Sequence, residues 1–190
     1  MTWNVENFFV PKPADQAAYD AKLAELADVI TAAAPDLLAV QEVGDAASFE
    51  ALRAKLGAGW TGVLSTHFAT PHTIRVGWLS LPGGRFDTSD ETERARYGVY
   101  ALDRRAAESG GRSGLGHDLV GRRVGRAASR INQGRHELID HILVSHAVVG
   151  HLTDATTVPL EVPSIGVQPH TAPRTDPPSD HRPVLAHFDV

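Results

Sequence analysis

A continuous apolar run at residues 37–40, Leu-Leu-Ala-Val, constrains the fold more than any other stretch of the chain. Runs of this kind are typical of strands that are covered on both faces. The preceding segment, residues 15–34, has its apolar side chains at the i, i+3, i+4, i+7 spacing of one buried helical face. These side chains are Leu23, Leu26, Ala27 and Ile30. We expect Asp15 to cap this helix and Pro35 to end it, so that a helix packs beside a buried strand.

Strand and helix patterns interleave along the rest of the chain. Strands are predicted at residues 2–9, 60–64, 73–79, 137–145 and 184–188, and helices at residues 46–56, which Gly57 ends, and 89–108. Residues 150–179 have little periodicity and hold six of the twelve prolines. They are predicted to form a long loop that is functional or partly disordered. Interleaved elements predict an α/β or α+β class with helices packed outside the sheets.

Size and composition fit a single domain over residues 1–190, because 42% of the residues are hydrophobic. The net charge of -5 argues against nucleic-acid binding over the whole surface and leaves room for a local contact. Cysteine is absent, so a bound metal would need Asp, Glu, Asn or His ligands. No apolar run has membrane-spanning length and no signal peptide is visible, which makes the cytoplasm the default expectation. Met1 stands only two residues before Trp3, which leaves open a longer native chain.

Acids and amides gather at the predicted strand ends. Asn4 and Glu42 lie at the ends of two strands, and Asp180 with His181 precedes the last strand. Asp140 is predicted inside the strand at residues 137–145, where an unpaired carboxylate would be costly, so we expect His181 to be its partner. Oxygen-rich groups of this kind suit Mg²⁺, and an imidazole oriented by a carboxylate is suited to proton transfer. The pattern suggests phosphoester hydrolysis.

Four motifs occur in an order that is similar to that of the endonuclease/exonuclease/phosphatase superfamily, a group of metal-dependent hydrolases. They are residues 2–7 (TWNVEN), 35–43 (PDLLAVQEV), 137–145 (ELIDHILVS) and 179–184 (SDHRPV). The resemblance extends over most of the chain, from residue 2 to residue 190. It implies a DNase-like four-layer α-β-β-α sandwich, here with an incomplete second half.

The resemblance also implies roles for five residues. Glu42 resembles the principal metal ligand, Asn4 a group that binds metal or phosphate, and Asp180 a second metal ligand. His181 is similar to the catalytic, phosphate-contacting imidazole, and Asp140 to the carboxylate that orients it. The implied cofactor is Mg²⁺, with Mn²⁺ as a substitute. The implied substrate is a phosphoester, with a phosphodiester such as DNA or RNA the leading expectation.

Two motifs that the family normally carries are missing from this chain. One is a strand that ends in His, expected after residues 74–80, and the other is a Gly-Asp-Leu-Asn strand end, expected near residues 109–116. We therefore expect internal deletions. They should lower the stability of the fold or cause the protein to associate. Two alternatives stay open: a catalytically degenerate member that acts as a binding or scaffold protein, and a nucleic-acid-binding surface without chemistry. The second would use eight arginines, at positions 104, 105, 112, 122, 123, 126, 130 and 135.

Overall fold

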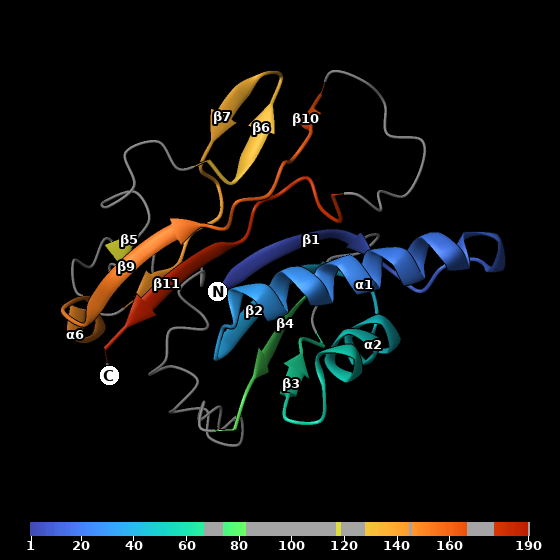
Figure 1. Cartoon of the computed structure of the whole chain (residues 1–190), viewed down its shortest axis with the longest axis horizontal. Helices are drawn as coiled ribbons and strands as arrows, with labels where there is room; N and C mark the ends of the chain where they lie inside the picture. The colour runs from blue at the N-terminus through green and yellow to red at the C-terminus, as the bar shows by residue number, and fades with distance from the viewer. Residues whose placement is uncertain (67–73, 83–116, 119–127, 145, 167–176, 190) are drawn as a thin grey trace.

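The computed structural model describes residues 1–66, 74–82, 117–118, 128–144, 146–166 and 177–189, and its fold is α/β (Figure 1). The largest element is a six-stranded mixed sheet with strand order β3-β4-β2-β1-β11-β9. Its strands are β1 (Thr2–Phe8), β2 (Leu37–Val43), β3 (Thr61–Leu64), β4 (Arg75–Ser80), β9 (Leu152–Thr157) and β11 (Val184–Phe188). The first strand, β1, lies at the centre, parallel to β2 and antiparallel to β11.

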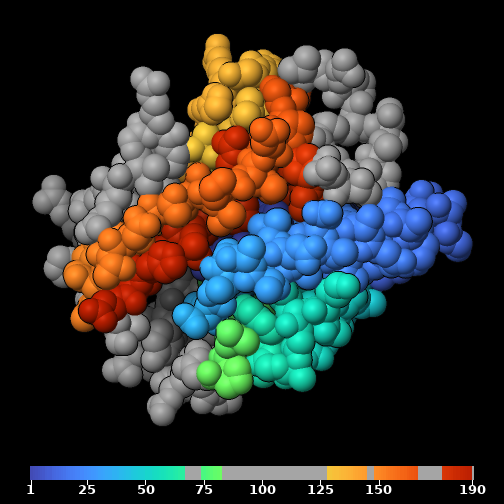
Figure 2. Space-filling model, in the orientation of Figure 1, coloured from blue at the N-terminus to red at the C-terminus, as the bar shows by residue number. Residues whose placement is uncertain are grey.

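Two helices cover one face of this sheet. They are α1 (Gln16–Ala33), which follows the short 3-10 helix η1 (Pro13–Asp15), and α2 (Ala46–Leu56). On the face shown in Figure 2, α1 and α2 lie side by side, whereas β9 and β11 reach the surface beside α1. The main core lies between helices and sheet, where Trp3, Leu26, Leu38 and Leu52 are fully buried. Each such side chain stabilises the fold by about 1.5–3 kcal/mol.

The helix predictions at residues 15–34 and 46–56 are confirmed, but one predicted cap is wrong. Asp15 stands at the N-cap position of α1 and makes no side-chain capping bond, because η1 leads into the helix instead. Asp45 caps α2, with its Oδ1 accepting the Ser48 N–H at 2.7 Å. Gly57 ends α2 with a φ of 114°, a conformation that costs glycine little.

The opposite face of β9 and β11 carries a second, smaller core. Ala155 and Val184 are buried there, packed against partly buried apolar side chains of the two strands and of the segment before them: Leu138, Ile142, Val144, Val149, Leu152, Ala186 and Phe188. Two short ladders complete the described strands: β5 (His117–Asp118) with β8 (Leu143–Val144), and β10 (Ser164–Ile165) with β6 (Arg130–Asn132) and β7 (Arg135–Glu137). A four-residue helix, α6 (His146–Val149), precedes β9. The large sheet with its helices thus agrees with a DNase-like α/β fold.

Two sequence predictions in the second half are wrong. The strand predicted at residues 137–145 is interrupted, because β7 ends at Glu137 and β8 begins at Leu143. Asp140 therefore lies between strands, and its N–H donates to Ser129 Oγ at 3.2 Å in place of a ladder bond. The loop predicted at residues 150–179 contains β9, which pairs with β11 along its length, and β10.

The remaining predictions fall into two groups. The strands predicted at residues 2–9, 37–40, 60–64, 73–79 and 184–188 are confirmed as β1, β2, β3, β4 and β11. The helix predicted at residues 89–108, the second expected deletion point near residues 109–116 and most of the arginine-rich stretch lie outside the described residues. The first expected deletion point, after residues 74–80, follows the end of β4 within the described range 74–82. Within the described part of the chain, no helix is long and apolar enough to cross a membrane.

Candidate active site

Glu42 stands near the end of β2, and β1 holds both of its carboxylate oxygens. Asn4 Nδ2 donates to Oε1 at 2.8 Å, and the Asn7 N–H donates to Oε2 at 3.1 Å. The backbone here is left-handed at Glu6 (φ 48°), Asn7 (φ 50°) and Glu42 (φ 63°). Such conformations cost non-glycine residues free energy and concentrate at functional sites. They coincide with a register shift between β1 and β2, which lets the end of β1 turn toward Glu42.

Three hydrogen bonds fix the segment before β11, and two of them join it to β1. Ser179 Oγ donates to the Asn4 carbonyl at 2.6 Å and accepts the His181 N–H at 3.0 Å. The indole Nε1 of the buried Trp3 donates to the His181 carbonyl at 2.8 Å. Ser179 therefore links β1, whose Asn4 and Asn7 donate to Glu42, to the backbone that carries the imidazole.

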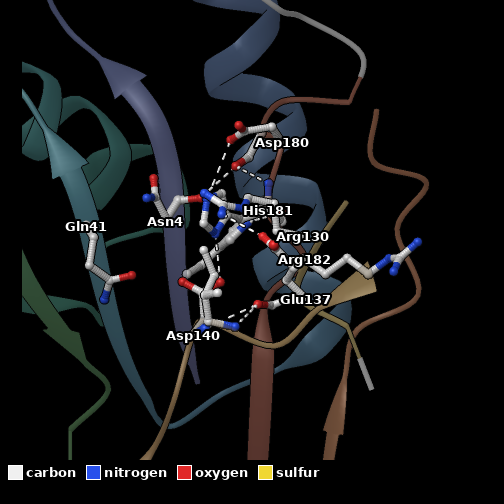
Figure 3. Close-up of polar contacts among 12 residues, drawn as sticks. Asn4, Gln41, Arg130, Glu137, Asp140, Asp180, His181 and Arg182 are labelled. Atoms are coloured by element: carbon white, nitrogen blue, oxygen red, sulfur yellow. Dashed lines mark hydrogen bonds and ion pairs between the residues drawn. The ribbon is translucent and has the colours of Figure 1, made fainter. Parts of the chain in front are cut away.

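The His181 ring is bonded to Asp140 (Figure 3). Its Nδ1 lies 2.7 Å from Asp140 Oδ2, and the two side chains are only 8% and 11% exposed. Its other nitrogen, Nε2, lies 3.8 Å from Asp180 Oδ1. Burial, the largest single influence, lowers the pKa of His181, but the hydrogen bond and charge of Asp140 with the charge of Asp180 outweigh it. The pKa of His181 is therefore raised above its ordinary value, and the protonated ring is stabilised.

The start of the β6–β7 hairpin holds Asp140 and His181 together. Ser129 Oγ accepts the Asp140 N–H, and the Ser129 carbonyl accepts the Arg182 N–H at 2.6 Å. Arg130 forms an isolated antiparallel bridge with His181 and an ion pair with Glu137 at 2.7 Å. The hydrogen bond from Arg130 lowers the pKa of Glu137, so this carboxylate stays charged.

The fit of a divalent cation depends mainly on Glu42. Among the described residues, no group of three or more His, Asp or Glu side chains is arranged to hold a metal. Mg²⁺, however, usually keeps several waters and takes only one or two carboxylates. Two donors occupy Glu42, and a carboxylate offers about four acceptor positions, so each of its oxygens can still bind a cation. The donor set therefore fits a largely hydrated ion and does not fit a cage made by the protein alone.

The structure joins the five predicted site residues in two groups. Asn4 contacts Glu42, while His181 contacts Asp140 and has Asp180 beside it. Asn4 uses both ends of its amide within the protein, because its Oδ1 also accepts the Glu6 N–H at 2.9 Å. Metal binding by Glu42, Asn4 and Asp180 and phosphate binding by Asn4 and His181 stay predictions.

Several residues that build the site were not predicted from the sequence: Glu6, Asn7, Lys22, Ser129 and Ser179. Ser179 carried a usable signal, since a serine two residues before a site histidine can bond to the backbone locally. Lys22 carried another, because it precedes the predicted core residue Leu26 by one helical turn.

The described site thus combines a glutamate near the end of β2 with a largely buried Asp–His pair. The Endonuclease/Exonuclease/phosphatase family model matches residues 1–93. This match supports the endonuclease/exonuclease/phosphatase superfamily of phosphoesterases, whose members generally use divalent metal ions. The matched segment holds Asn4 and Glu42, whereas Asp140, Asp180 and His181 lie beyond it. No curated protein and no solved structure gives a significant match to the chain.

Proposed function

We propose that this protein is a divalent-metal-dependent hydrolase of phosphodiesters, with nucleic acid as the leading substrate. The observation that carries the proposal is the 2.7 Å contact between His181 Nδ1 and Asp140. Ser179 joins the segment of His181 to Asn4 of β1, and Asn4 donates a hydrogen bond to Glu42. An imidazole with one nitrogen fixed by a carboxylate presents the other nitrogen in a defined tautomer. His181 Nε2 is that nitrogen.

His181 has the geometry for proton transfer to or from a bound phosphoester. In the neutral ring, Nδ1–H donates to Asp140, so Nε2 is free to accept a proton from an attacking water. Asp140 stabilises the imidazolium that results, and Asp180 adds a second negative charge at 3.8 Å from Nε2. Glu42 and Asp180 would hold Mg²⁺ or Mn²⁺, which supplies positive charge against the phosphate oxygens when it is bound.

A second candidate function is a degenerate member that binds metal or phosphate without turnover. The described residues contain no cluster of three acidic or histidine ligands, and the sequence lacks a Gly-Asp-Leu-Asn motif. Both observations favour weak metal binding and leave the attacking water without its usual acid and amide.

Turnover of bis-nitrophenyl phosphate and nicking of plasmid DNA, each with Mg²⁺ or Mn²⁺, separate the two functions. We expect metal-dependent turnover that Glu42→Gln and His181→Gln each reduce by about 10²–10⁴-fold. The matched controls are Glu50→Gln on the exposed side of α2 and His187→Gln on the exposed side of β11, which should retain activity. Absence of turnover, together with Mg²⁺-dependent heat stabilisation that Glu42→Gln abolishes, would support the degenerate function. Turnover that survives both site substitutions would exclude the proposed site.

A further inference from the structure

Lys22 is a buried lysine on the core side of α1. It is 6% exposed and lies one and two turns before the buried Leu26 and Ile30, so it extends the apolar stripe of the helix. A lysine in this position normally bends its ammonium group back into water. Lys22 instead donates from Nζ to the Glu6 carbonyl at the end of β1. Burying an ammonium group is costly unless strong acceptors meet it, so the contact with this carbonyl needs a structural reason.

The acceptor belongs to the left-handed turn at Glu6 and Asn7. Two consecutive non-glycine residues with positive φ are strained and persist only where surrounding contacts hold them. Asn4 Oδ1 holds the turn from one side by accepting the Glu6 N–H at 2.9 Å. Lys22 Nζ holds it from the other side through the carbonyl of the same residue.

This turn gives Glu42 one of its two donors. Because the chain reverses its usual extended course at Glu6, the Asn7 N–H points to Glu42 Oε2 at 3.1 Å. A chain of direct contacts thus runs from Lys22 on α1 through Glu6 and Asn7 to Glu42.

We propose that Lys22 is a positioning residue for Glu42: its ammonium group pins the Glu6–Asn7 turn, and the turn fixes the carboxylate orientation. The consequence for metal binding rests on the proposed function, whereas the consequence for the turn does not. Groups that orient a metal ligand typically contribute about 10–100-fold to metal affinity. Lys22 supplies this support from a helix that carries none of the five predicted site residues.

Lys22→Met tests the proposal, because it keeps an apolar stem and removes the donor. Lys22→Arg keeps a charged donor, and Lys55→Met makes the same chemical change at an exposed position of α2. The first measurement is hydrogen exchange of the Asn7 amide by NMR. We expect Lys22→Met to accelerate this exchange about tenfold, the equivalent of one lost hydrogen bond, while Lys22→Arg and Lys55→Met leave it near the wild-type rate.

The second measurement is Mn²⁺ affinity by electron paramagnetic resonance, in wild type, Lys22→Met, Glu42→Gln and the double variant. We expect Lys22→Met to weaken binding at least tenfold and to weaken it no further once Glu42→Gln is present. Faster Asn7 exchange with no Mn²⁺ binding by the wild type would keep Lys22 in its role and reject the proposed function. Unchanged Asn7 exchange in folded Lys22→Met would overturn the proposal.

Two other variants, Lys22→Gln and Lys22→Arg, still test the proposal if Lys22→Met fails to fold. If Lys22→Met unfolds, Lys22→Gln, with a shorter neutral donor, is measured in the same way and should show intermediate exchange at Asn7. Exchange in Lys22→Arg as fast as in a variant without a donor would also overturn the proposal, because the hydrogen bond would then not be what holds the turn.

Discussion

Replacing Asp140 by Asn should destabilise the protein in a pH-dependent manner. The substitution keeps the shape of the side chain and exchanges a charged acceptor for a neutral one beside His181 Nδ1. Because the pKa of His181 is raised in the folded protein, the stabilisation from the charged pair is complete below the pKa of an unfolded histidine, about 6.5. It is lost as the pH rises through the raised value. Asp140→Asn should therefore cost more at pH 5.5 than at pH 9.

The size of the effect follows from the geometry of the pair. A hydrogen bond to a charged group contributes about 1.5–3 kcal/mol and a neutral one about 0.5–1.5 kcal/mol. At 2.7 Å and with both side chains largely buried, the Asp140–His181 bond lies toward the strong end of its class. The difference, about 1–2 kcal/mol at low pH, lowers the melting temperature by roughly 2–8 °C for a chain of this size.

Urea unfolding, followed by tryptophan fluorescence at both pH values, measures this cost. Trp3 is a suitable reporter because its indole donates to the His181 carbonyl. Asp154→Asn is the matched control, since Asp154 lies opposite His187 in the β9–β11 register with both residues exposed. It should change stability by less than about 0.5 kcal/mol. An Asp140→Asn cost that is equal at pH 5.5 and pH 9, or larger at pH 9, would refute the reasoning.

Two further predictions concern the scaffold and are checked by the same unfolding assay. Gly77→Ala should destabilise the protein by about 1–3 kcal/mol, because the added Cβ would lie 2.5 Å from Cε2 of the buried Phe49. Combining it with Phe49→Leu should recover part of this loss. If the costs of the two substitutions simply add in the double variant, the clash is contradicted. Asp45→Ala should cost about 1 kcal/mol or more, since Asp45 accepts from both the Ser48 and Val10 N–H groups; a neutral effect would show that the cap is dispensable.

The N-terminal half of the fold follows closely from its sequence pattern. The helix expected at residues 15–34 is found as α1, and the apolar run that starts at Leu37 is found as β2. Strong periodicity and a proline stop determine these elements locally, so tertiary contacts had little to change. The burial of Lys22 does not follow from the local pattern. It depends on the Glu6 carbonyl, which lies where the β1–β2 register shifts.

The second half depends on contacts between distant segments, which a pattern does not contain. Alternating apolar residues at 137–145 predicted one strand. That strand is interrupted because Ser129 Oγ accepts hydrogen bonds from the N–H groups of Ile139 and Asp140. β9 is polar along much of its length and was missed, since its ladder partner β11 begins some distance along the chain at Val184. The pairing of Asp140 with His181 was expected from the cost of a lone buried carboxylate, and the structure contains that contact.

The central place of β1 in the sheet has a consequence for the nascent chain during translation. Thr2 pairs with Ala39 on one side and with Val184 on the other, so one flank of β1 finds its neighbour early and the other only after β11 has been synthesised. Until then that flank offers unpaired backbone groups to other chains. His181, just before this late strand, contacts Asp140. Until translation has passed β11, the nascent domain is therefore prone to aggregate and lacks the Asp140–His181 contact.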